Sequence, residues 1–123
     1  MNEAPAIMVL DRNARNLELV EDLLRRAGYR TAGVSDLEDA QRLIVEETGI
    51  AMALLDIGGF DSSVWQVCAA LHDKGIPFLV VSPGRNEAAE RQGYARGARG
   101  FLIKPLTVKQ LLGLVRSLLG TSA

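Results

Sequence analysis

Four polar residues stand directly after short hydrophobic segments, and their side chains suit chemistry on phosphate groups. They are Asp11 after 6–10, Asp56 after 50–55, Ser82 after 77–81 and Lys104 after 100–103. An aspartate can attack phosphorus as a nucleophile, and a lysine or a hydroxyl can engage the transferred oxygens. Two carboxylates can also hold a divalent cation through their oxygens. Any one of these residues alone is best explained by pairing at a buried edge, but four at matching positions favour a site.

The segments before these residues must bring them together, and their pattern predicts parallel strands. Apolar runs rich in β-branched residues alternate with longer stretches of helical period. The runs are 6–10, 30–34, 50–55, 77–81 and 100–103. Continuous rather than alternating apolar residues indicate strands buried on both faces. The pattern is (βα)5 and predicts an α/β fold, a doubly wound five-stranded parallel sheet. Ligands in such folds bind at the carboxyl ends of the strands, where the four residues would converge.

Helix signals fill the intervals between the predicted strands. Gly28 is well placed to end a first helix. Ser35 with Glu38 forms a plausible capping box for a second helix, and Thr107 with Gln110 forms another for the fifth. The third and fourth helices are expected at about 63–74 and 87–96.

The length and composition predict a single domain over residues 1–123. No apolar run approaches the length that crosses a bilayer, and the N-terminal residues lack the pattern of a signal peptide. We therefore expect a cytoplasmic protein that does not contact a membrane. The single cysteine, Cys68, is expected to be a buried structural thiol, and the single histidine, His72, a solvated residue near a helix end.

Charge is unevenly distributed along the chain although the formal net charge is only −1. Residues 1–61 hold twelve acids and six bases, and residues 62–123 hold three acids and eight bases. The bases lack dense clustering and interleaved aromatic residues, so no direct contact with nucleic acid is expected.

Other kinds of phosphate or hydrolase site lack their motifs. No glycine-rich phosphate loop follows the first strand, which argues against a nucleotide held in a backbone cradle. Two glycines follow Asp56, but such a pair is more often a turn than an anion site. The motif of a serine hydrolase is also missing from the sequence, and we expect no enzyme.

The chain resembles the receiver domains of bacterial two-component response regulators over nearly its whole length. The resemblance rests on the acid-ended strand at Asp11, AGY at 27–29, LLD at 54–56, the hydroxyl of Ser82, GA at 97–98 and the pair Lys104-Pro105. It implies a flavodoxin-like, CheY-like sheet with strand order 2-1-3-4-5. It also implies phosphorelay signalling.

The resemblance assigns roles in a phosphorylation site. Asp56 is similar to the phosphoacceptor, the residue that becomes an aspartyl phosphate. Asp11 is similar to a residue of the acidic pocket that holds Mg²⁺. The backbone carbonyl of Gly58 matches the main-chain metal ligand of the family.

Further residues resemble those that read the phosphorylated state. Lys104 and Ser82 match the residues that engage the phosphoryl group. Phe101 lies where receivers usually carry an aromatic switch residue, although it also suits the core of the last strand. The bond before Pro105 is commonly cis in the family.

Arg12 is the main departure from the family pattern. It falls where receivers usually carry a second acid, so Asp11 and Asp56 face two bases, Arg12 and Lys104, and the pocket is balanced without a metal ion. Two like unit charges about 4 Å apart repel by ~4 kcal/mol at an effective dielectric constant of 20, and a divalent ion doubles that. We therefore expect Mg²⁺ to bind only weakly. If the arginine swings into solvent, Asp11, Asp56 and the Gly58 carbonyl remain as a reduced metal site.

Two functions remain open on the sequence. In the first, a histidine kinase or phosphotransfer protein donates a phosphoryl group to Asp56. In the second, the chain is a pseudo-receiver, a binding module in which an Arg12–Asp56 ion pair replaces metal, phosphate or both. In either case a single domain must signal through another protein. The expected contact face comprises the fourth and fifth strands with the helices that follow them, a region containing Arg85, Arg91, Arg96 and Arg99.

Overall fold

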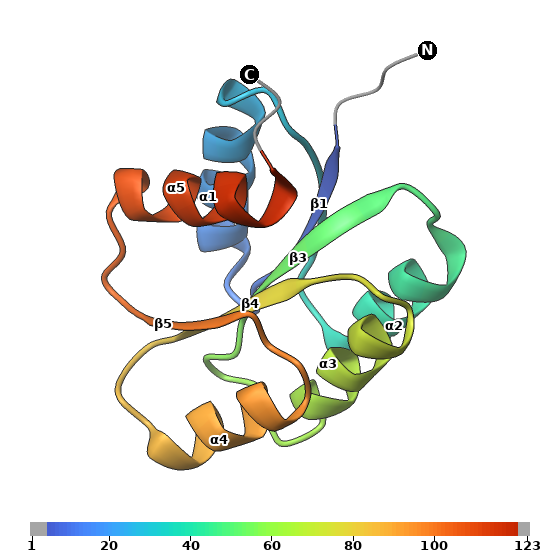
Figure 1. The fold of residues 1–123 in the computed structure, drawn as a ribbon, viewed down its shortest axis with the longest axis vertical. Helices are drawn as coiled ribbons and strands as arrows, with labels where there is room; N and C mark the ends of the chain where they lie inside the picture. The colour runs from blue at the N-terminus through green and yellow to red at the C-terminus, as the bar shows by residue number, and fades with distance from the viewer. Residues whose placement is uncertain (1–4, 121–123) are drawn as a thin grey trace.

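The protein is described by a computed structural model over residues 5–120. Within this range the chain forms one five-stranded parallel sheet, with the strands in the order β2-β1-β3-β4-β5 (Figure 1). The strands are β1 (Ala6–Leu10), β2 (Arg30–Val34), β3 (Ile50–Asp56), β4 (Phe78–Ser82) and β5 (Gly100–Ile103). Fold class and strand order are therefore as predicted.

Helices cover both faces of the sheet. They are α1 (Ala14–Arg26), α2 (Leu37–Glu46), α3 (Val64–Asp73), α4 (Glu87–Ala95) and α5 (Val108–Leu119). Figure 1 shows α1 and α5 on one side of the sheet and α2, α3 and α4 on the other. None of the helices in residues 5–120 combines the length and the apolar character needed to cross a membrane.

The core consists of two hydrophobic clusters separated by the sheet. Met8 and Leu10 of β1 point into the cluster under α2 and α3, while Ile7 and Val9 point into the cluster under α1 and α5. These residues are almost fully buried, which explains why β1 reads as a continuous apolar run. Full burial of each such side chain contributes about 1.5–3 kcal/mol. Cys68 lies in the first cluster, where burial raises the pKa of its thiol to about 12.

The ends of the helices follow local hydrogen-bonding rules, with one correction. The capping box of Thr107 and Gln110 is present at the start of α5. The prediction that Ser35 caps α2 is wrong, because the side chain of Asp36 accepts the backbone N–H of Asp39 at 2.7 Å. Gly28 ends α1 with a φ of +99°, a conformation that glycine adopts without a steric penalty.

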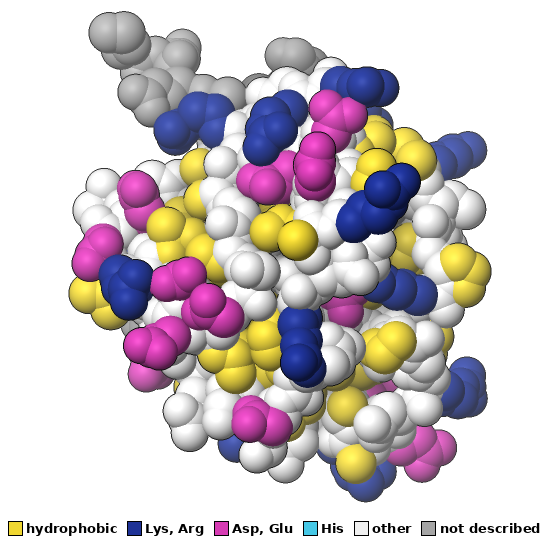
Figure 2. Space-filling model, turned by 180° about the vertical axis from the view of Figure 1, so that it is seen from behind, with side chains coloured by type: hydrophobic (Ala, Val, Ile, Leu, Met, Phe, Trp, Pro, Cys, Tyr) yellow, Lys and Arg dark blue, Asp and Glu magenta, His cyan; other side chains and the backbone are white. Residues whose placement is uncertain are grey.

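Surface charge follows the uneven distribution in the sequence. Viewed from behind, acidic side chains gather along the edge formed by α2, at the left of Figure 2. Glu38 and Asp39 occupy the first turn of that helix, and Glu46 is its last residue. On the opposite edge of the sheet, only Ala89 and Gly93 of α4 are buried, so α4 is weakly anchored to the core.

Candidate functional site

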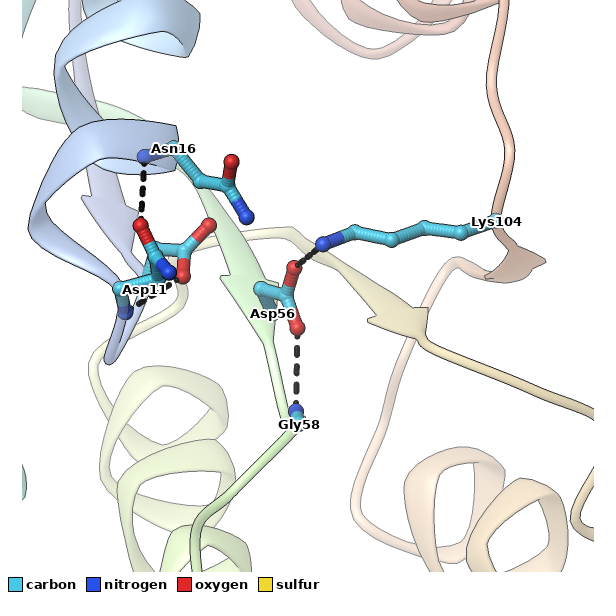
Figure 3. Close-up of polar contacts among 6 residues, drawn as sticks. Asp11, Asn16, Asp56, Gly58 and Lys104 are labelled. Atoms are coloured by element: carbon cyan, nitrogen blue, oxygen red, sulfur yellow. Dashed lines mark hydrogen bonds and ion pairs between the residues drawn. The ribbon is translucent and has the colours of Figure 1, made fainter.

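The carboxyl ends of the strands bring Asp11, Asp56 and Lys104 together, as Figure 3 shows. Asp11 directly follows β1, Asp56 ends the adjacent β3, and Lys104 follows β5. The ammonium group of Lys104 forms an ion pair with Oδ2 of Asp56, whose side chain is only 11% exposed. The peptide bond from Lys104 to Pro105 is cis, as predicted.

Asp11 is a buried carboxyl group at the floor of the site, 6% exposed. Its Oδ1 accepts the backbone N–H of Asn13 at 2.9 Å. Burial raises the pKa of Asp11 above its usual range, and the nearby negative charge of Asp56 adds to the rise, while the Asn13 hydrogen bond and the charge of Lys104 oppose it. The two carboxylates therefore repel one another at close range.

Asp56 keeps acceptor capacity for an incoming group. Its Oδ1 accepts the backbone N–H of Gly58 at 3.0 Å, and its Oδ2 pairs with Lys104. An ionised carboxylate offers about four lone-pair positions, so these two contacts orient the group without filling it. The arrangement suits nucleophilic attack on phosphorus, with Lys104 beside the reacting oxygens.

A cavity of about 610 Å³ opens above this cluster, between α1, the strand ends and α5. Its lining includes Asp11, Asn16, Asp56 and Lys104. The sequence interpretation missed Asn16, whose side chain extends from α1 toward Asp56 in Figure 3. A helical spacing of three to four residues links Asn16 with Leu19, Val20 and Leu23 of the same lining, and that spacing was the available signal.

Ser82 and Phe101 contact residues other than Asp56. Ser82 is buried, and its hydroxyl donates to the carbonyl of Gly84 at 2.6 Å. It lines a neighbouring cavity of about 500 Å³ rather than the one containing Asp56 and Lys104. Phe101 is half-buried in β5 and packs close to Gly93 of α4. Their roles in reading a phosphorylated state remain predictions.

Arg12 does not form the ion pair with Asp56 that the pseudo-receiver hypothesis requires. No ion pair joins these two described residues. The guanidinium Nη1 of Arg12 donates instead to the carbonyl of Gly59. Gly59 has a φ of +82°, and a Cβ at that position would lie 3.0 Å from Cδ of Arg12. The exposed arginine thus spans from the loop after β1 to the loop after β3.

Two side chains at this site, those of Asp11 and Asp56, could act as ligands of a metal ion. Within residues 5–120 no group of three or more His, Cys, Asp or Glu residues could hold an ion. The two repelling carboxylates of Asp11 and Asp56 nevertheless fit a hard divalent cation that takes its other ligands from water and from backbone carbonyl oxygens. The residues present would thus supply two carboxylate ligands of such an ion.

Solved structures share this architecture. A response regulator receiver domain protein (CheY-like) from Methanospirillum hungatei JF-1 has a TM-score of 0.88 at 19% identity, covering 95% of this chain and 94% of that chain. A response regulator from Burkholderia pseudomallei, solved with a phosphorylated aspartic acid, calcium ion and citrate, has a TM-score of 0.80 at 25% identity. That match covers 89% of this chain and 65% of the other. The fold is that of a response regulator receiver domain.

Curated sequence relatives are response regulators as well. The transcriptional regulatory protein HprR of Escherichia coli is 31% identical over 114 residues, which cover 90% of this chain and 50% of HprR. GltR of Pseudomonas aeruginosa, also a transcriptional regulatory protein, is 27% identical over 118 residues, covering 93% of this chain and 48% of GltR. The chain spans about half the length of these relatives. No family model matches it.

The close approach of Arg12 to Gly59 predicts a stability effect at Gly59. Gly59→Ala should lower the free energy of unfolding by about 1–2 kcal/mol, because alanine is strained at positive φ and its Cβ would press on Arg12. Gly113→Ala, in open space on α5, is the matched control and should raise it by about 0.5–1 kcal/mol. Urea denaturation measures both. In a double-mutant cycle, Arg12→Ala should reduce the Gly59→Ala penalty, and an unchanged penalty would exclude the contact.

The raised pKa of Asp11 predicts a pH-dependent effect on stability. A folded-state pKa above the unfolded one means that the folded protein loses stability as pH rises through that interval. Asp11→Asn keeps an acceptor for the Asn13 N–H and removes the charge. In chelator it should therefore be more stable than wild type at neutral pH, with the gain vanishing below about pH 3.5, where aspartic acid is neutral in both states. A variant less stable than wild type at neutral pH would contradict the assignment.

Proposed function

We propose that this receiver domain accepts a phosphoryl group on Asp56 from a phosphohistidine of a histidine kinase or phosphotransfer protein. The observation that carries the proposal is the Asp56 carboxylate, oriented by Lys104 and the Gly58 N–H and lining the cavity beside Asp11. The Burkholderia pseudomallei neighbour with a phosphorylated aspartic acid supports it.

The proposed step is a simple displacement at phosphorus. A carboxylate oxygen of Asp56 forms a bond to phosphorus as the P–N bond of the phosphohistidine breaks, and the bonding electron pair stays on the imidazole nitrogen. The product is an acyl phosphate and a free histidine. Lys104 is placed to neutralise phosphoryl oxygens, and Ser82 would reach them only after its hydroxyl leaves the Gly84 carbonyl.

A magnesium ion is proposed as a weakly bound partner of this step. Oxygens of Asp11 and Asp56 would hold it, together with the backbone carbonyl of Gly58. When bound, Mg²⁺ supplies positive charge that offsets the two carboxylates and the phosphoryl oxygens. Arg12 opposes its binding, because a fixed positive charge lies on the adjacent Gly59 carbonyl.

The signal is proposed to pass to another protein through the surface of β4, α4, β5 and α5. Of α4 only Ala89 and Gly93 are buried, so this helix can shift at low cost when Phe101, packed near Gly93, changes position. We propose residues 1–123 as a single receiver unit with no enzymatic output of its own. The pseudo-receiver alternative lacks its Arg12–Asp56 ion pair, because Arg12 donates to the Gly59 carbonyl instead.

Phosphorylation of Asp56 can be tested with acetyl phosphate as donor. Incubation in Mg²⁺ followed by intact-mass measurement should show one added phosphoryl group in the wild-type protein and none in Asp56→Asn. Asn keeps the size of the side chain and an acceptor oxygen but is a poor nucleophile. Absence of any adduct, with and without Mg²⁺, in a protein that is folded by circular dichroism would refute the proposal.

The opposing charge of Arg12 can be tested by titration with Mg²⁺. Arg12→Asp should bind Mg²⁺ at least about tenfold more tightly than wild type, a change of about 1.4 kcal/mol, because it replaces a repelling charge with a carboxylate ligand. Fluorescence of Trp65, the chain's single tryptophan, reports binding from the first turn of α3, where it lines the same cavity as Gly58. Arg15→Asp makes the same charge change at an exposed residue of α1 and is the control. Equal affinities in the two variants would show that Arg12 does not influence the metal site.

A further inference from the structure

The side chain of Arg12 contacts the backbone of Gly59 and does not simply extend into solvent. Its Nη1 donates to the Gly59 carbonyl, and its Cδ lies 3.0 Å from the position that a Cβ of residue 59 would take. A side chain at position 59 would press on the arginine stem at this distance, and Gly59 also has a positive φ. The position of the guanidinium is therefore fixed by the loop that follows the proposed phosphoacceptor.

The same loop links that guanidinium to the Asp56 carboxylate through two adjacent glycines. Oδ1 of Asp56 lies 3.2 Å from the position of a Cβ on Gly58, and Arg12 contacts the next residue, Gly59. Consecutive Cα atoms are about 3.8 Å apart. Asp56 and Arg12 thus flank one glycine dipeptide, with Asp56 on its first residue and Arg12 on its second.

The guanidinium also has unused hydrogen-bonding capacity. Arginine carries five N–H donors in a planar fork that matches phosphate oxygens. Within residues 5–120 Arg12 forms one hydrogen bond, the bond to Gly59, and its side chain is exposed. At least three donors remain for a group that arrives at Asp56.

Phosphorylation of Asp56 would make the pocket more negative, and the positive charge of an arginine would offset part of this change. Before phosphorylation Asp11 and Asp56 face Lys104 and Arg12. A phosphoryl group carries about −1.5 to −2 at neutral pH, so the acyl phosphate is more negative than the carboxylate it replaces. Lys104 alone leaves an excess of negative charge that a receiver with Arg12 can reduce without a metal ion.

We propose that Arg12 is a phosphoryl ligand. While its Nη1 is bonded to the Gly59 carbonyl, its remaining N–H groups donate hydrogen bonds to the oxygens of the group transferred to Asp56. Its positive charge then replaces part of the charge that a divalent cation would supply. This inference rests on the proposed function and assigns to Arg12 a role that requires no metal. Transfer to Asp56 then proceeds in the absence of Mg²⁺.

The experiment compares metal dependence among matched arginine variants. Wild type, Arg12→Ala, Arg12→Lys and Arg15→Ala are incubated with acetyl phosphate in excess EDTA or in Mg²⁺, and the adduct is followed by intact mass. In EDTA, Arg12→Ala should form the adduct about tenfold or more slowly than wild type. Arg12→Lys should be intermediate because it keeps the charge and loses the fork. Arg15→Ala should remain within about twofold of wild type.

Added Mg²⁺ distinguishes a phosphoryl ligand from a merely structural residue. It should largely remove the deficit of Arg12→Ala, since a cation can then occupy the vacated region, whereas a folding defect would persist in both conditions. Thermal denaturation of each variant checks that the fold is retained. Equal rates for wild type and Arg12→Ala in EDTA, or a wild-type adduct that forms only with Mg²⁺, would overturn this inference and leave the proposed function standing. No adduct in either condition would overturn both.

Discussion

The structure of the site depends on two buried carboxylates that lie close together beside one lysine at the edge of a parallel sheet. Asp11 and Asp56 lie on adjacent strands, so their charges cannot move apart, and Lys104 pairs with only one of them. The raised pKa of Asp11 reflects its burial and this repulsion. Two carboxylates beside one lysine favour a further positive group nearby, either a divalent cation or the guanidinium of Arg12.

The loop after β3 links the chemistry of the pocket to its charge balance. The backbone N–H of Gly58 donates to the carboxylate of Asp56, and the carbonyl of Gly59 accepts a hydrogen bond from the guanidinium of Arg12. Two successive glycines allow both contacts, because side chains at either position would crowd Asp56 or Arg12. The loop beside the pocket therefore holds the positive charge of Arg12 on the carbonyl of Gly59.

The sequence predicted the sheet and the convergence of the site because both follow from short-range patterns. Continuous apolar runs mark strands buried on both faces, and the polar residue after each run lies at the same edge. Directions of side chains were harder to predict. Arg12 was expected either to pair with Asp56 or to extend into solvent. It donates instead to the carbonyl of Gly59, in a loop far along the chain. The turn of the Ser82 hydroxyl toward Gly84 likewise depends on the local conformation of its loop.

Identity of the modified residue is the most direct test of this account. Reduction of the phosphorylated protein with borohydride converts an aspartyl phosphate into homoserine, and tandem mass spectrometry of the peptides locates the converted residue. The account predicts homoserine at position 56 and aspartate at position 11. Conversion at another aspartate, or a phosphoryl group that resists reduction as a serine or threonine ester does, would contradict it.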